Sequence, residues 1–379
     1  MLGGQQLRHS SRRALHEHRL MTELPPLSSD SDLAARAGVS LEAVQLLRGT
    51  EVIDLHIESF IPPRLWGYDL RKRHGTLALG GRFFGHLDFP RALDGGLTGG
   101  MWSVATNILR GKKGRLAAVK KNIAGLADVV GQTGDRMRVV RTFREFEAAR
   151  RAGAHAVLLS VQGGNAFDAS PTGPLVIEDR LLTRVTVVHL SNSGYGGTSS
   201  PLSLMSGGRG LTDHGRLFIE QLNEGRIYVD LAHIAEEGFW DVVAVHDRDQ
   251  PLLVTHTGVD GVRDMWRNLN DKQIKAVADT DGAIGIIFQA GFLKRPGGPK
   301  DGRMVIEHLR HVIDVVGEDY AALGSDYDGF ITPPPDLRDG GVGFPRLVQY
   351  MLDEGWSVER IQKILGGNFL RTFRAIRPD

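Results

Sequence analysis

The sequence contains no cysteine, and this absence excludes a whole class of stabilising and metal-binding chemistry. Disulfide bonds and thiolate zinc sites both need cysteine, so any metal must be held by histidine, carboxylate or amide side chains. An excess of one charge is also lacking, because 46 Lys and Arg residues balance 45 Asp and Glu residues. This balance gives no electrostatic reason to expect a nucleic-acid or membrane-surface partner.

Long hydrophobic runs are absent as well. No apolar stretch approaches the roughly 18 residues that a membrane-spanning helix needs, and the basic N-terminus lacks the apolar core of a secretory signal. We therefore expect no membrane partner and a cytoplasmic protein. The polar residues 1–30 predict an arm or loop, and Ser40 and Gly49 predict the start and stop of a short helix. This segment superficially resembles a helix-turn-helix, but it runs directly into a strand of the main domain.

The rest of the chain alternates between short apolar runs and amphipathic stretches. Between the runs, apolar residues recur at helical spacing, as Leu211, Phe218 and Leu222 do. Buried continuous strands that alternate with helices are typical of a parallel sheet, and eight of them favour a closed (β/α)8 TIM barrel at residues 50–379, after the N-terminal arm and helix at 1–49. A doubly wound open sheet is the alternative, but no strand is followed by a glycine-rich phosphate turn. The eight runs are residues 52–58, 100–106, 155–162, 185–191, 227–233, 252–257, 283–288 and 320–326.

Polar side chains capable of acid–base or metal chemistry stand where most of these runs end. In a (β/α)8 barrel the carboxyl ends of all strands face one mouth, so we expect these side chains to converge there. One histidine at such a place is commonly structural, whereas a set at successive strand ends indicates a functional site. The set is His56, Glu58, Gln162, His189, His233, His256 and Asp326.

The spacing of these residues favours a metal site. His56 and Glu58 are two apart, which places them on the same face of a strand, where they can chelate one ion. His233 and His256 follow neighbouring strands and can hold a second ion. Neutral imidazole and carboxylate ligands with one open position suit zinc, which lowers the pKa of a bound water toward ~7 and polarises a carbonyl.

Several motifs resemble those of the membrane dipeptidase family (renal dipeptidase-like, peptidase family M19). The resemblance covers roughly residues 50–375 in order. The first metal motif of the family reads His-x-Asp, and DLHIE resembles it in this chain. The family segment that LLSVQGG resembles carries a glutamate that bridges the metal ions. The resembling segments are DLHIE, FPRALDGGLTGGMWSV, LLSVQGG, TVVHLSNS, IYVDLAH, VTHTG, WRNL, LGSDYDG and KILGGNFLRTF.

The resemblance implies a zinc-dependent hydrolase that cleaves dipeptides or related small amides with a free carboxylate. It also suggests a homodimer. By this resemblance Asp326 acts as the general base or anchors the substrate amine, His189 stabilises the oxyanion, and Arg267 pairs with the substrate carboxylate. The metal ligands that it implies are His56, Glu58, Gln162, His233 and His256.

Two residues depart from the family pattern. Glu58 stands where the family has aspartate, which lengthens the arm but keeps the charge. Gln162 stands where the family has its bridging glutamate, and a neutral amide does not offset the repulsion between two dications. We therefore expect one zinc ion at His233 and His256, assisted by Gln162 or Asp326, and leave two ions open. The alternative is a non-catalytic relative that binds a small ligand or a protein partner.

Overall fold

A computed structural model describes most of the chain, namely residues 23–75, 80–107, 109–201 and 209–379. Nine strands within these ranges form one parallel sheet, and eight of them follow one another around a ring. The ring consists, in order, of β1 (Ile53–Ile57), β2 (Gly99–Ala105), β4 (His155–Gln162), β5 (Leu182–Thr186), β6 (Tyr228–Asp230), β7 (Leu253–Thr257), β8 (Ala283–Ile286) and β9 (Ala321–Leu323).

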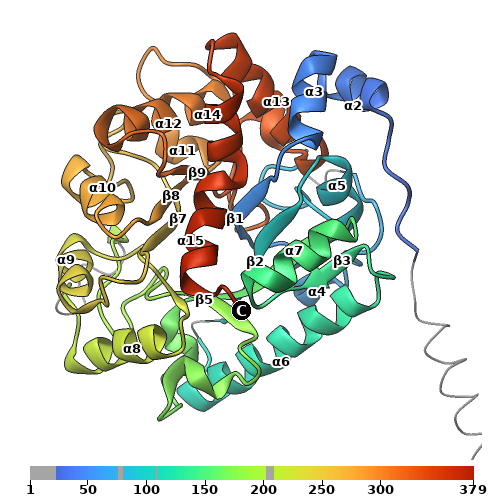
Figure 1. Ribbon diagram of the computed structural model, residues 1–379. Coiled ribbons are helices and arrows are strands. Elements are labelled where there is room, and N and C mark those ends of the chain that lie inside the picture. Colours follow the sequence, from blue (N-terminus) through green and yellow to red (C-terminus); the bar gives the residue numbers. More distant parts are fainter. Residues whose placement is uncertain (1–22, 76–79, 108, 202–208) are drawn as a thin grey trace, which may run out of the picture.

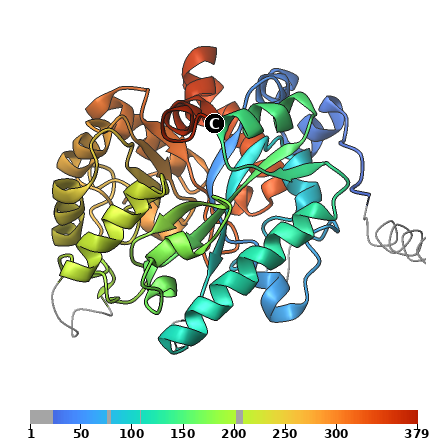
Figure 2. The same ribbon diagram turned by 60° about the horizontal axis from the view of Figure 1, so that its bottom comes forward.

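The ring closes between its first and last strands. Ile57 pairs with Tyr327 in parallel orientation, and the amide of Glu58 donates to the carbonyl of Tyr327 at 2.9 Å. The amide of Asp326 donates to the carbonyl of His56, also at 2.9 Å. The fold is therefore the predicted (β/α)8 TIM barrel, and Figures 1 and 2 show its helices around the sheet.

The helices cover the sheet with the apolar faces that the sequence pattern predicts. On α12, for example, Val305, Leu309 and Val312 are fully buried. No helix in the described part of the chain has both the length and the apolar character to cross a membrane. The helices are α2 (Asp30–Ala37), α3 (Leu41–Arg48), α4 (Ile61–Trp66), α5 (Phe89–Asp94), α6 (Lys112–Gly131), α7 (Phe143–Arg151), α8 (Asp213–Glu224), α9 (Glu236–Val245), α10 (Asp271–Ala278), α11 (Ala290–Leu293), α12 (Arg303–Val316), α13 (Gly340–Asp353), α14 (Val358–Gln362) and α15 (Asn368–Ile376).

Two strands differ from the sequence prediction. Strand β5 ends at Thr186, where its hydrogen-bond ladder with β6 also ends. The predicted run 185–191 therefore lies mostly beyond the observed strand. His189 is therefore on a loop at the mouth. The sequence prediction also misses β3 (Met137–Val139), a strand of three residues that pairs only with β4 and lies off the ring.

The short helix before the barrel has the predicted ends. The Ser40 side chain accepts from the amide of Ala43 at 3.1 Å, and Gly49 follows the last turn of α3. Helices α2 and α3 pack against α13 on the outside of the barrel, as Figure 1 shows. The predicted arm at residues 1–30 lies mostly outside the described residues, and residues 23–29 form neither helix nor strand.

The last helix, α15, lies across the end of the barrel that faces the viewer in Figure 1. Directly after it, the fully buried Arg377 donates to backbone carbonyls of several separate segments. Its shortest bonds, both 2.7 Å, join the carbonyls of Arg226 and Leu182, and a third of 2.9 Å joins that of Arg180. Because Leu182 begins β5, Arg377 fastens the end of the chain to the amino ends of the strands, opposite the mouth.

Candidate metal centre

The predicted site residues all lie at one mouth of the barrel. His56 and His256 are on β1 and β7, and Gln162 is the last residue of β4. His233 and Asp326 follow their strands with φ of +68° and +60°. Such left-handed backbone costs a non-glycine residue roughly 1–3 kcal/mol and is common at functional sites, where the surrounding structure imposes it.

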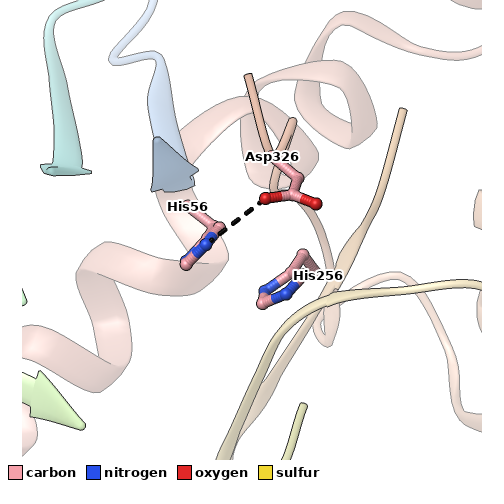
Figure 3. Close-up of side chains that lie close together, drawn as sticks. All are labelled: His56, His256 and Asp326. Atoms are coloured by element: carbon pink, nitrogen blue, oxygen red, sulfur yellow. Dashed lines mark ion pairs between the residues drawn. The ribbon is translucent and has the colours of Figure 1, made fainter. Parts of the chain in front are cut away.

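The first half of the site contains His56, His256 and Asp326, which Figure 3 shows side by side. One nitrogen or oxygen atom from each lies within 4.8 Å of the others, and the two imidazole rings stack with centroids 3.9 Å apart. His56 Nε2 is 3.5 Å from Asp326 Oδ1 and 3.5 Å from Glu58 Oε1. The predicted pair of His56 and Glu58 is therefore brought together, and Asp326 joins it from the last strand.

The second half of the site contains His256 again, together with His233, Gln162 and His189. His256 Nε2 and His233 Nε2 face each other at 2.9 Å, and Gln162 Nε2 lies 3.3 Å from His233 Nε2. The same amide nitrogen lies 2.7 Å from His189 Nε2. The predicted pair of His233 and His256 is thus close enough for both rings to contact one small cation, with Gln162 beside them.

Thr255 and Asp230 form a hydrogen-bonded chain that holds the Nδ1 side of the His256 ring. Asp230 accepts from the Thr255 hydroxyl at 2.8 Å, so that hydroxyl is free to accept the Nδ1–H of His256 at 2.9 Å. This arrangement leaves the lone pair of His256 on Nε2, toward His233. Burial opposes ionisation of Asp230, but Arg184 and hydrogen bonds from Thr186 and Thr255 outweigh it and lower the pKa of this carboxyl.

Arg184 is a component of the site that the sequence analysis misses. It lies in the middle of β5, is fully buried, and pairs with Asp230 at 3.2 Å. Its Nη2 also lies 2.6 Å from His56 Nδ1. The signal was present in the sequence, because a single arginine inside the otherwise uncharged strand LTRVT must be buried with a partner. Asp230 in IYVD and Thr255 in VTHT carry the same kind of signal.

Burial controls the protonation of the site. It lowers the pKa values of His56, His233 and His256 well below their usual range, so all three rings are neutral at pH 7. It raises the pKa of Asp326 well above its usual range, and the neighbouring Glu58 raises it further. Neutral imidazole is the form that binds metals, and a nearby cation would return Asp326 to its ionised form.

Several buried polar atoms at the mouth have no hydrogen-bond partner among the described residues. They include Gln162 Oε1, Asp326 Oδ1, Glu58 Oε1 and His56 Nε2. An unsatisfied buried group costs roughly 1–3 kcal/mol, so a cluster of them indicates a ligand that the protein itself does not supply. The donor set of imidazole nitrogen and carboxylate oxygen suits a small hard or borderline cation such as zinc.

Arg267 lies beside this cluster. It is almost fully buried, and its Nη2 donates to the carbonyl of His256 at 2.7 Å. Burial lowers the pKa of its guanidinium to about 10, although Asp326 and Asp230 oppose this shift. Arg267 and His233 line a pocket of about 240 Å³ that also includes Trp266. The pocket is therefore lined both by a cation, Arg267, and by the candidate metal ligand His233.

Comparisons with known proteins agree with this geometry. The model of the membrane dipeptidase family, peptidase family M19, matches residues 41–378. Dipeptidase tcpJ of Claviceps purpurea (strain 20.1) is 27% identical over 301 residues, which are 77% of this chain and 69% of tcpJ.

Two solved structures are similar over nearly their whole length. The metallopeptidase dipeptidase AC of family M19 has a TM-score of 0.76 and 26% identity, covering 87% of this chain and 99% of its own. A metallopeptidase from Rhodobacter sphaeroides, bound to a phosphinate mimic of the dipeptide L-Ala-D-Ala, has a TM-score of 0.73 and 25% identity, covering 86% and 99%. The chain described here belongs to the membrane dipeptidase family, a family of metallohydrolases.

Proposed function

We propose that this protein hydrolyses dipeptides or related small amides with a free carboxylate, using one zinc ion held by His233 and His256. The observation that carries the proposal is the 2.9 Å approach of two neutral imidazole Nε2 atoms. Two lone pairs at this distance repel each other unless a proton or a cation lies between them. The partnerless Gln162 Oε1 and Asp326 Oδ1 supply further donor atoms nearby.

The remaining residues have roles that follow from their positions. Asp326 acts as the general base or anchors the substrate amine, and His189, on its loop at the mouth, stabilises the oxyanion. Arg267 pairs with the substrate carboxylate from the pocket wall. When bound, zinc supplies Lewis acidity that polarises the scissile carbonyl and favours deprotonation of the attacking water.

Gln162 disfavours a second ion at the site, and Glu58 does not compensate for it. A 180° turn of the Gln162 amide exchanges its nitrogen and oxygen, so the oxygen can face His233 as a neutral ligand. It brings no negative charge, however, so the repulsion between two dications a few ångströms apart is poorly offset. Glu58 lies beside His56, where burial raises the pKa of its carboxyl, and it does not replace the missing bridging carboxylate. We therefore assign one zinc ion, in the half of the site that contains His233 and His256.

The similar proteins support the choice of substrate. One curated relative is a dipeptidase, and one similar structure binds a dipeptide mimic. A dipeptide has a carboxylate that suits Arg267 and an amine that suits Asp326, and the pocket of about 240 Å³ fits a molecule of that size.

Elemental analysis and a hydrolysis assay test the proposal together. Freshly purified protein should contain one zinc ion per chain and should cleave dipeptides with a free C-terminus. His256→Ala should lose both properties, because it removes a ligand. A metal-free chain that remains inactive in excess zinc or cobalt would show that the proposal is wrong.

The second candidate is a non-catalytic relative that binds a small ligand or a protein partner. Gln162 favours it, since the loss of the bridging charge is the change expected in a decayed dinuclear site. Calorimetry separates the two functions. Binding of dipeptides by zinc-loaded protein without any turnover would favour the non-catalytic relative.

A further inference from the structure

Arg184 imposes a difference between the two stacked histidines of the site. It is fully buried on β5, and its Nη2 lies 2.6 Å from His56 Nδ1. A guanidinium group carries only hydrogen-bond donors, so His56 Nδ1 must be the acceptor. The proton of the neutral His56 ring is therefore on Nε2, the atom that points toward Glu58 and Asp326.

A histidine that binds a metal through Nε2 needs the opposite arrangement. Its Nε2 must carry a lone pair, and its Nδ1–H must donate to an acceptor. His256 meets both conditions, because its Nδ1 lies 2.9 Å from the Thr255 hydroxyl, which donates to Asp230 and accepts from the ring. His56 meets neither, although it stacks on His256 within the same cluster.

We propose that Arg184 makes this a one-metal centre by holding His56 in the tautomer that carries its proton on Nε2. The proposal rests on the proposed function for the existence of the metal at His233 and His256, and it adds the residue that excludes a second ion. Arg184 is thus a positioning residue that acts through His56. The Nε2–H of His56 faces Glu58 and Asp326, each 3.5 Å away, where a second ion would otherwise bind.

The charges of the site point the same way. A second ion is repelled by positive charge nearby, and Arg184 brings a buried positive charge beside His56 while Gln162 brings no negative charge to offset it. Arg184 is also more than a counterion for Asp230, because that carboxylate has other donors. It accepts from the amides of Ala232 and Thr255 at 3.1 and 3.0 Å, and from the hydroxyls of Thr186 and Thr255 at 2.7 and 2.8 Å.

Zinc stoichiometry in two Arg184 variants tests the proposal. Arg184→Met removes the donor and its charge, whereas Arg184→Lys keeps a cation that can donate to His56 Nδ1. In a zinc titration followed by elemental analysis, the unaltered protein and Arg184→Lys should bind one ion per chain. Arg184→Met should take up a second ion. Thermal unfolding of each variant shows whether it is folded, and Asp230 keeps its four other hydrogen bonds in both.

His56→Ala identifies where each ion binds. In the unaltered protein it should leave the zinc content at one ion per chain, and in the Arg184→Met background it should remove the second ion. The proposal is overturned if the unaltered protein binds two ions. It is also overturned if His56→Ala removes the single ion, or if folded Arg184→Met stays at one ion in excess zinc.

Nitrogen NMR of ¹⁵N-histidine-labelled protein provides a test that needs no Arg184 variant. The signals of His56, assigned by their absence in His56→Gln, should show an unprotonated Nδ1 and a protonated Nε2, both unchanged by zinc. A protonated Nδ1 overturns the proposal. An unaltered protein that binds no zinc would instead contradict the proposed function, and the spectrum would still determine the His56 tautomer.

Discussion

At the scale of single residues, Thr255 connects His256 to the charged interior of the barrel. Thr255→Val removes the acceptor of the His256 Nδ1–H, while the ligand atom itself stays in place. We expect zinc affinity to fall by roughly 10- to 100-fold with an unchanged stoichiometry, which is the usual effect of losing such a supporting bond. Competition with a chromophoric chelator measures this affinity.

Thr255→Ser is the matched control, because it keeps the hydroxyl that joins His256 and Asp230. It should retain most of the zinc affinity. If the serine and valine variants were equally weak, the loss would come from packing around the threonine methyl group, and the hydrogen bond would have no part in it.

Arg267 is the second residue whose contribution can be isolated. Arg267→Ala should reduce kcat/KM for dipeptides by roughly 10- to 100-fold, because a charge-assisted bond is worth about 1.5–3 kcal/mol. C-terminally amidated analogues should be hydrolysed as by the unaltered protein, since they offer no carboxylate. Parallel kinetics on the two substrate types check this, and equal losses on both would assign Arg267 to support of the His256 carbonyl alone.

At the scale of elements, Arg377 shows how the end of α15 is fixed to the barrel. Arg377→Ala leaves several carbonyls without their donor, including those of Arg226 and Leu182. We expect the free energy of unfolding to fall by about 2–4 kcal/mol, as for other losses of buried charge-assisted bonds. Urea denaturation measures the change.

The control for this variant is Arg374→Ala on the same helix. Arg374 is 68% exposed, lies over the Phe143 ring and is 3.9 Å from Glu147. Exposed pairs of this kind contribute about 0–1 kcal/mol, so this variant should be nearly as stable as the unaltered protein. Comparable losses in both variants would mean that α15 is held by its general packing rather than by Arg377.

At the scale of the whole molecule, buried neutral histidines outside the metal centre make stability depend on pH. Burial lowers the pKa of His155 to about 4, against 6.5 for an ordinary histidine. The unfolded chain therefore takes up a proton at a higher pH than the folded chain. The stabilisation is complete above pH 6.5 and is lost as the pH falls toward 4, by roughly 3 kcal/mol in total.

Urea titrations at pH values between about 7.5 and 4.5 measure this slope. His155→Gln should make it shallower, because glutamine can accept from Trp102 Nε1 and donate to the Leu97 carbonyl without titrating. An unchanged slope in this variant would mean that other buried histidines cause the pH dependence. His308 is one of them, because burial lowers its pKa to about 4 as well.

The fold and the location of the site could both be predicted from the sequence, but the pairing of its residues could not. Apolar runs alternating with helices determine the barrel, and parallel strands carry their terminal polar residues to one mouth. Which atoms meet there depends on barrel closure, which brings Asp326 to His56 as close as Glu58. The arginine inside the strand LTRVT indicates a buried cation with a partner, but the sequence alone does not identify His56 and Asp230 as the partners of Arg184.

Closure of the ring through its first and last strands also determines when the protein becomes complete during synthesis. His56 and Ser325, which meet at the seam, are 269 residues apart in the chain. At roughly 5–20 residues per second, β1 waits on the order of tens of seconds for β9 to be translated. The nascent sheet has an open edge during that time, and every candidate site residue named above except Asp326 has already been made. The metal centre is therefore finished by the final part of the polypeptide, and a ribosome-bound chain that stops before β9 should bind zinc weakly.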